Sequence, residues 1–306
     1  MKIFPQAPES WSAHYRKFSI GEWHGMISTK HSEMDFGKAL GSLDDLFHEG
    51  NIVKWYKKQR NHLAEVHWPG NAEGMPKTVV LKRYGSNTIY HTIRHKIGLP
   101  RAIRHWNNAW MLLEKKITTP VPIMIGLKRN GSGQGMIAVE TVKHHQRIRD
   151  IFPRDYYGEE SERAIGQTKI NTREFSKICG QYVRSIHDKG IVHRDLSGAN
   201  ILVPDSWDGS VEKLTEEFVI LDINRIRWLS QEAMDINYRI QDLERLSIPD
   251  NHLKEYYVAY AGDDNDLLKQ WPKFLKYRRG YRKIKETKSP FLRGAKKVFF
   301  YWPRAR

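Results

Sequence analysis

The stretch GIVHRDLSGANILV places a carboxylate, an amide and two basic side chains in one short loop. Asp195 can accept a proton from an attacking hydroxyl group, and Asn200 can offer a neutral oxygen to Mg²⁺. The metal then needs a second carboxylate, which Asp222 supplies at the end of the apolar segment FVILD. His193 and Arg194 directly precede Asp195 and are the other catalytic candidates of the loop. These residue types suit phosphoryl transfer, which depends on positioning and charge neutralisation.

A lysine that reaches the phosphates of ATP is expected on a strand earlier in the chain. Lys82 in VVLKRY fits, because strand alternation points its side chain to the same face as Val80. Each candidate alone has an ordinary explanation: a strand lysine is usually solvated, and an aspartate after a strand often caps a turn. The order of lysine strand, helix, two strands, helix and catalytic loop favours the functional interpretation, because every ordinary explanation would have to hold independently.

The elements before residue 143 predict an antiparallel sheet with one inserted helix. NIVKWYKK and LAEVHW alternate as a hairpin, TVVLKRY is a third strand, and IMIGLKR and GMIAVETV are two more. Between the third and fourth strands, Ile103, Trp106 and Trp110 recur at spacings of three and four, which is one helical face.

The elements after residue 143 are predicted to be mostly helical. TREFSKICGQYVRSIHDKG has one apolar face, with Thr172 suited to cap its start and Gly190 suited to end it. YRIQDLERL and NHLKEYYVAYAG are two further helices. The lone Cys179 is interpreted as core packing, since one cysteine cannot form an intramolecular disulfide. The fold class is therefore α+β.

Several segments together carry a resemblance to a known family. The chain resembles the protein-kinase-like fold in HRDLSGANILV, VVLK and LDIN. It resembles the bacterial lipopolysaccharide core kinases, the Kdo and heptose kinase family, in LPRAIRHWNNAWMLLEKKITTPVPI, LDINRIRW and RIQDLERL. The resemblance implies a two-lobed fold: an N-lobe with an N-terminal extension over residues 1–142, a C-lobe with the catalytic loop over 143–268, and a basic, aromatic segment over 269–306.

The resemblance also implies an activity. A member of this family uses ATP and Mg²⁺ to phosphorylate a Kdo or heptose hydroxyl of the lipopolysaccharide inner core, or of a lipid-linked precursor, at the cytoplasmic face of the inner membrane. The sequence has no run of eighteen apolar residues and no secretory signal, so we expect a cytoplasmic, peripheral protein.

Further positions follow from the resemblance. MIAVETV occupies the place of the hinge that binds adenine through backbone groups, which assigns Glu140 and Val142 by position. Glu114 is the candidate partner of Lys82, with a plain surface residue as the alternative. Arg225, in a D-x-x-R pattern, is expected to meet an anionic sugar, with an ion pair to the metal-binding aspartate as the alternative. No G-x-G-x-x-G motif is present in the predicted hairpin.

The segment after the metal-binding aspartate is short. Twenty residues separate Asp222 from Asp242, which leaves little room for a peptide-docking segment. Asp242 is expected to brace the catalytic loop by accepting its backbone N–H groups, and a surface carboxylate on a helix is the alternative.

Positive charge is concentrated at the C-terminus. Residues 269–306 contain fourteen Lys or Arg and one acid, a net charge of +13 out of +16 for the chain. Aromatic side chains alternate with the basic ones, which favours an anionic membrane surface over nucleic acid. The candidate contact residues are Lys276, Arg278, Arg279, Arg282 and Lys283.

Two other functions stay open at this point. A kinase of the same fold could act on another small molecule or on a protein hydroxyl. A non-catalytic kinase-like protein could bind lipopolysaccharide or anionic lipid, because the glycine motif is missing. Nucleic-acid binding has no fold motif to support it.

Overall fold

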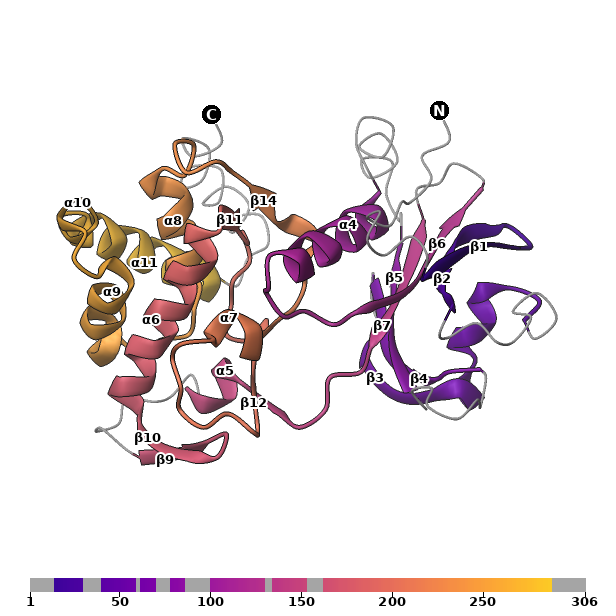
Figure 1. Ribbon diagram of the computed structural model, residues 1–306, viewed down its shortest axis with the longest axis horizontal. Helices are drawn as coiled ribbons and strands as arrows, with labels where there is room; N and C mark the ends of the chain where they lie inside the picture. Colours follow the sequence, from indigo (N-terminus) through magenta and orange to yellow (C-terminus); the bar gives the residue numbers. More distant parts are fainter. Residues whose placement is uncertain are drawn as a thin grey trace. The chain divides into compact units, whose positions relative to one another are not determined.

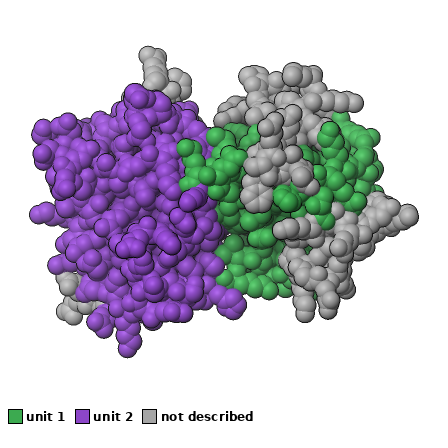
Figure 2. All heavy atoms as spheres, viewed as in Figure 1, with its two compact units in different colours: residues 1–115, 119–143 green, residues 116–118, 144–306 purple. Residues whose placement is uncertain are grey.

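The structure is a computed structural model that describes residues 14–29, 40–58, 61–69, 78–85, 100–129, 134–152 and 162–287 (Figure 1). The chain divides into two compact units, which Figure 2 shows in different colours. The first unit comprises residues 1–115 and 119–143, and the second comprises residues 116–118 and 144–306.

The first unit is built on one antiparallel sheet. Its strands are β1 (Tyr15–Ile20), β2 (Trp23–Ser28), β3 (Ile52–Lys57), β4 (Asn61–His67), β5 (Thr78–Tyr84), β6 (Pro122–Lys128) and β7 (Gly135–Glu140), in the order β1-β2-β6-β7-β5-β4-β3. The predicted hairpin is β3–β4, the predicted third strand is β5, and the last two predicted strands are β6 and β7. The turn between β3 and β4 includes residues 59–60, which lie outside the described residues.

The hairpin β1–β2 was not among the predicted elements. Ile20 pairs with Trp23, so a two-residue turn joins the strands. Part of the signal was present in the sequence, because FSI alternates and a glycine follows directly. The exposed Arg16, Lys17 and Ser19 made this strand less evident than the apolar ones.

The two faces of this sheet carry separate apolar clusters. Val79 and Leu81 of β5 belong to one cluster, which the short 3-10 helix η2 (Leu43–Phe47) also covers. Val80 and Tyr84 lie on the other face, with helix α4 (Arg101–Glu114). Since side chains alternate along a strand, Lys82 faces the α4 side, as the sequence predicted from Val80.

Helices dominate the second unit, as expected. They are α5 (Ile148–Ile151), α6 (Thr172–Asp188), α7 (Leu214–Glu217), α8 (Ile236–Leu243), α9 (Leu253–Ala261), α10 (Asn265–Leu268) and α11 (Trp271–Glu286). The strands are short: β8 (His145–Arg147), β9 (Glu162–Ile165), β10 (Thr168–Asn171), β11 (Ile191–Val192), β12 (Ile201–Pro204), β13 (Val219–Ile220) and β14 (Arg227–Trp228). The antiparallel hairpin β9–β10 was not predicted.

Helix α6 begins and ends at defined signals. The side chain of Asn171, not that of Thr172, caps its start, accepting the backbone N–H of Arg173 at 2.7 Å. Thr172 is fully buried, and its hydroxyl lies 3.3 Å from Nε2 of His252. The prediction of a threonine cap is therefore wrong by one residue. Gly190 follows the helix with φ +79°, as predicted for its end.

Helix α6 also carries Cys179, which is free and buried. Burial raises the pKa of its thiol, so the thiolate is disfavoured. The interpretation of Cys179 as core packing is confirmed.

Helix α11 packs into the second unit through its aromatic side chains. The Phe274 ring is fully buried and stacks on Tyr257 with ring centroids 4.9 Å apart, and Trp271 also contacts Tyr257. Phe274 therefore belongs to the core, and the half-buried Trp271 packs against it. In the part of the chain that the structure describes, none of the helices is both long and apolar enough to span a bilayer.

Candidate active site

Short strands fix both ends of the loop that carries Asp195. β11 pairs with β14 immediately before His193, and β12 pairs with β13 immediately after Asn200. The loop also approaches α5, because the backbone N–H of Arg149 donates to the carbonyl of Gly198 at 3.0 Å. A Cβ atom at Gly198 would lie 2.9 Å from that nitrogen, so glycine is needed for this approach.

Asp242 of α8 holds the start of the loop. Its Oδ2 accepts the backbone N–H of His193 at 2.6 Å, and its Oδ1 accepts that of Arg194 at 2.7 Å. Asp242 is fully buried, and Arg194 has φ +66°. Two charge-assisted bonds therefore stabilise a backbone conformation that non-glycine residues rarely adopt. This confirms the predicted bracing role of Asp242.

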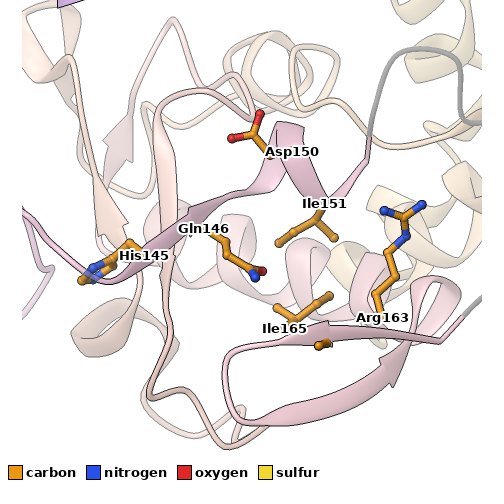
Figure 3. A pocket seen from close by; sticks show the side chains of 7 residues that line it. His145, Gln146, Asp150, Ile151, Arg163 and Ile165 are labelled. Carbon is orange, nitrogen blue, oxygen red and sulfur yellow. The ribbon is translucent and has the colours of Figure 1, made fainter.

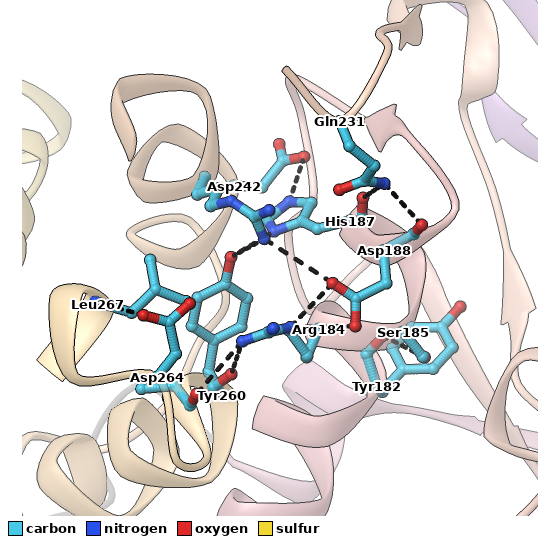
Figure 4. A network of polar contacts seen from close by, with 12 residues as sticks. Tyr182, Arg184, Ser185, His187, Asp188, Gln231, Asp242, Tyr260, Asp264 and Leu267 are labelled. Atoms are coloured by element: carbon cyan, nitrogen blue, oxygen red, sulfur yellow. Dashed lines mark hydrogen bonds and ion pairs between the residues drawn. The ribbon is translucent and has the colours of Figure 1, made fainter. Parts of the chain in front are cut away.

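Behind Asp242, three side chains form a chain of polar contacts (Figure 4). Nη1 of Arg239 donates to the Tyr260 hydroxyl oxygen at 3.0 Å, and that oxygen lies 2.8 Å from Nδ1 of His187. Nε2 of His187 lies 3.5 Å from Oδ2 of Asp242. In the tautomer with its hydrogen on Nε2, His187 would face Asp242 with an N–H group and accept the Tyr260 proton at Nδ1.

This pair combines an ionised carboxylate with a neutral imidazole. Burial alone would raise the pKa of Asp242, but His187, His193 and the His193 backbone N–H outweigh it and hold the pKa below its ordinary value. Burial lowers the pKa of His187 below its ordinary value, although Asp242 partly opposes the shift. The carboxylate is therefore charged and able to accept both loop N–H groups at neutral pH.

The buried His187 predicts a loss of stability in mild acid. The unfolded chain binds a proton at this histidine near pH 6.5, whereas the folded chain does so only at lower pH. The contribution of neutral His187 to the free energy of unfolding is fully present above the pKa of this histidine in the unfolded chain. It declines as the pH falls from that value through the pKa in the folded chain, by up to about 1.4 kcal/mol per pH unit. Urea unfolding of the wild type between about pH 7 and pH 5 should therefore show a steeper decline than unfolding of His187→Gln. The exposed His144→Gln should follow the wild type; equal slopes for all three proteins would contradict the assignment.

Asn200 and Asp222 stand at adjacent positions of two paired strands. The backbone N–H of Leu221 donates to the carbonyl of Asn200 at 2.8 Å, continuing the β12–β13 ladder. Nδ2 of Asn200 donates to the backbone carbonyl of Asp195 at 2.9 Å, which leaves the Asn200 side-chain oxygen as the group that can bind a metal ion. Oδ1 of Asp222 accepts from Nδ2 of Asn224 at 2.7 Å.

The chemistry of this amide and carboxylate pair suits Mg²⁺. Both side chains offer hard oxygen ligands, and Mg²⁺ is commonly held by one or two protein groups together with phosphate oxygens and water. Among the described residues, His, Cys, Asp and Glu side chains form no group of three or more that could hold a metal ion.

Two arginines contact the carboxylate of Asp195. Nη1 of Arg245 lies 3.3 Å from Oδ1, and Nη1 of Arg225 lies 3.2 Å from Oδ2. The side chain of Arg245 is 13% exposed and that of Arg225 is 60% exposed. Arg225 ends the short helix η4 (Ile223–Arg225), and the ion pair that the structure gives it is with Asp195.

Positive charge surrounds the loop. Burial lowers the pKa of Arg194, and the neighbouring Arg227, Arg225 and Arg245 lower it further. These four guanidinium groups make the surroundings of Asp195 favourable for anions. Sequence reasoning missed Arg227 and Arg245. The signal for Arg245 was its position three residues after Asp242 in QDLERL.

The first unit positions the other predicted ATP-binding residues. Nζ of Lys82 lies 5.2 Å from the centroid of the Tyr84 ring. Glu114 is exposed at the last position of α4. Glu140 ends β7, and its backbone N–H donates to the carbonyl of Val121 at 3.0 Å. Val142 follows, half-buried.

The basic residues of α11 separate into two faces. Lys276, Arg279 and Lys283 are exposed, and Arg282 pairs with Asp250. Arg278 is 5% exposed, and it donates to the backbone carbonyls of residues 244, 246 and 248. The prediction that Arg278 contacts a membrane is wrong, because its guanidinium is used inside the second unit.

A cavity of about 460 Å³ lies elsewhere in the second unit, between β8, α5 and β9 (Figure 3). None of the predicted site residues lines it; the lining residues are His145, Gln146, Asp150, Ile151, Arg163, Ala164 and Ile165. The candidate active site is therefore assigned to the residues around the loop and not to this cavity.

Comparisons with known proteins agree with the geometry. A solved structure titled "WaaP in complex with acyl carrier protein" is similar, with 15% sequence identity, a TM-score of 0.50, and coverage of 78% of this chain and 91% of that one. This likeness shows a kinase-like fold. The comparison with curated proteins found no match. The model of the lipopolysaccharide kinase (Kdo/WaaP) family matches residues 48–276, which include the braced loop, and the chain therefore belongs to that family.

Proposed function

We propose that this protein transfers the γ-phosphoryl group of ATP to a Kdo or heptose hydroxyl of the lipopolysaccharide inner core. The observation that carries the proposal is the placement of Asp195: a partly exposed carboxylate on a loop fixed by Asp242 and surrounded by guanidinium groups. Such a carboxylate can orient a hydroxyl, and such surroundings favour anionic reactants.

Each nucleotide-binding role has a candidate residue. Asn200 and Asp222 would hold Mg²⁺, which when bound neutralises charge on the phosphate oxygens of ATP. Lys82 would contact the phosphates, and the backbone at Glu140 and Val142 would bind adenine. Glu114, exposed at the end of α4, remains the candidate partner of Lys82.

In the transfer step, Oδ2 of Asp195 accepts the proton of the sugar hydroxyl. The hydroxyl oxygen forms a bond to the γ-phosphorus, and the bond from that phosphorus to the bridging oxygen of ADP breaks. Arg225 contacts the same Oδ2, and its side chain is largely exposed. We propose that Arg225 moves to an anionic group of the arriving acceptor and thereby releases Oδ2. His193 and Arg194 support the loop through the backbone bonds that hold Asp195 in place.

The acceptor is proposed to be an anionic glycolipid and not a peptide. The arginines near Asp195 can pair with carboxylate or phosphate groups, which the lipopolysaccharide inner core carries. Only twenty residues separate Asp222 from Asp242, and α8 occupies the last of them. This spacing leaves little chain for a peptide-docking segment.

The direct test supplies radiolabelled ATP and Mg²⁺ with three acceptors: whole lipopolysaccharide, free core sugars and a mixture of peptides. We expect label in the core oligosaccharide of lipopolysaccharide, and phosphorylation sites located by mass spectrometry would name the hydroxyl. Label in peptides alone would favour the protein-kinase alternative. The absence of transfer to any acceptor, together with retained lipopolysaccharide binding, would favour a non-catalytic binding protein.

The exposed basic face of α11 is proposed to dock on the anionic cytoplasmic surface of the inner membrane. Lys276, Arg279 and Lys283 point away from the core, and basic residues near an anionic bilayer contribute about 1 kcal/mol each. Changing all three to glutamate should reduce co-sedimentation with phosphatidylglycerol vesicles by at least about 100-fold in affinity. The exposed Lys254→Glu on α9 is the control for a change of net charge. Equal binding by the triple variant and the wild type would place the membrane contact elsewhere.

A further inference from the structure

Helix α11 reaches the catalytic aspartate through one arginine. Arg245, in the segment that follows α8, contacts Oδ1 of Asp195 at 3.3 Å and also donates to the backbone carbonyl of Arg194. The residues between Asp195 and Asn200 are LSGA, which contain no cation. Positive charge at Oδ1 is therefore supplied by a residue fifty positions later in the chain.

Two residues of α11 hold Arg245 in place. The guanidinium carbon of Arg245 lies 5.9 Å from the centroid of the Tyr281 ring, within the range of a cation–π contact. Arg278, one turn earlier on the same helix, donates to the Leu246 carbonyl at 2.6 Å and to the Ile248 carbonyl at 2.8 Å, and also to the Glu244 carbonyl. The backbone on both sides of Arg245 is thus tied to α11.

The burial of these groups shows that the arrangement is fixed. Arg278 is 5% exposed, and burial, with repulsion from Arg282, lowers its pKa to about 10, so it stays charged at neutral pH. Burial raises the pKa of Tyr281, and Arg245 and Asp195 are among the charges that act on it. Oδ1 of Asp195 therefore faces a nearly buried arginine, whereas Oδ2 faces the exposed Arg225.

We infer that α11 is part of the catalytic apparatus: Tyr281 and Arg278 position Arg245, and Arg245 anchors Oδ1 of Asp195 so that Oδ2 is the oxygen presented to the acceptor hydroxyl. This inference rests on the proposed function, because it assigns roles within the same phosphoryl transfer. It differs from that proposal in making Arg245, Arg278 and Tyr281 positioning residues, two of them in a helix whose composition alone indicated a membrane contact.

A double-mutant cycle on the full-length protein tests the inference. Arg245→Met should lower kcat with lipopolysaccharide by about 100-fold and leave the KM for ATP unchanged, because a misoriented base is lost but nucleotide binding is not. Tyr281→Leu should lower kcat by about 10-fold, and Tyr281→Phe, which keeps the ring, should retain nearly all of the wild-type kcat. In the Arg245→Met background, Tyr281→Leu should cause no further loss, since the tyrosine acts through the arginine.

The controls separate this inference from protein instability and from the proposed function. Lys254→Met removes one exposed positive charge from α9 and should leave kcat unchanged. Thermal shifts with Mg²⁺ and ATP should be equal in the wild type and the variants, which reports folded protein with intact nucleotide binding. A wild type that transfers no phosphate refutes the proposed function. If the wild type is active, three results would overturn only the role of α11. These are an active Arg245→Met, multiplicative effects of the Arg245 and Tyr281 changes, and a Tyr281→Phe variant as impaired as Tyr281→Leu.

Discussion

Replacement of Asp195 by alanine is expected to lower phosphate transfer from ATP to core lipopolysaccharide by about 1,000-fold. A positioned general base contributes roughly 10² to 10⁴ in rate, and Asp195 is the carboxylate that the loop presents. The Asp195 side chain is partly exposed, Arg225 is largely exposed, and the nearly buried Arg245 keeps its bond to the Arg194 carbonyl, so loss of the carboxylate should lower the melting temperature only slightly.

The measurement is single-turnover phosphate transfer at saturating ATP, with the melting temperature recorded for each protein. Asp266→Asn is the matched control, because it removes an exposed carboxylate that pairs with Lys269 far along the chain. Transfer by Asp195→Ala at the wild-type rate would reject Asp195 as the base. Loss of transfer in both variants would indicate a general defect and not a catalytic one.

Replacement of Asp242 by alanine is expected to have the largest effect on stability. It leaves the N–H groups of His193 and Arg194 buried without their acceptor and removes the charge beside His187. Breaking a buried, hydrogen-bonded charge typically costs about 3–5 kcal/mol. Asp242→Asn should also be destabilised, because an amide presents a donor to one of the two backbone N–H groups.

Helix α8 provides an internal control for Asp242. Asp235 caps this helix and also accepts two backbone N–H groups, those of Asn237 and Tyr238, but it is exposed. Asp235→Ala should therefore cost only about 1 kcal/mol. Urea unfolding measures both changes. Equal losses for the two variants would show that Asp242 is an ordinary cap.

At a temperature where Asp242→Ala remains folded, its turnover should still be at least about 100-fold below that of the wild type, because the loop is no longer held.

The bracing of the loop has a consequence for pH dependence. The pKa of Asp242 lies below its ordinary value, so its contribution to stability is present above the unfolded pKa of about 4 and is lost as the pH falls through the folded pKa. The contribution of His187 also declines as the pH falls, but its decline begins near the unfolded pKa of 6.5. As acid is added, the loss of stability linked to His187 therefore begins before the loss linked to Asp242.

Local patterns in the sequence determined the elements and much of the loop. Alternation identified the hairpin β3–β4, short apolar segments identified β5 to β7, and helical periodicity identified α4 and α6; α8 and α9 were also predicted as helices. The spacing from Asp195 to Asn200 predicted the loop, because these residues are close in sequence. The carboxylate of Asp242 predicted that a helix braces this loop, because a buried carboxylate can accept the backbone N–H groups that every loop has. The bracing by Asp242 is confirmed.

The tertiary structure decided which charged groups meet. Arginine has the same helical propensity and the same charge whether it is exposed or buried, so composition could not distinguish Arg278, which is buried, from Arg279, which is exposed. The partners of Arg225 and Arg245 lie thirty and fifty positions away, at Asp195, and only the packing of α8, η4 and α11 around the loop selects them. The sequence by itself therefore determined the chemical groups and their loop, whereas the packing of distant helices determined which arginine contacts each oxygen of the Asp195 carboxylate.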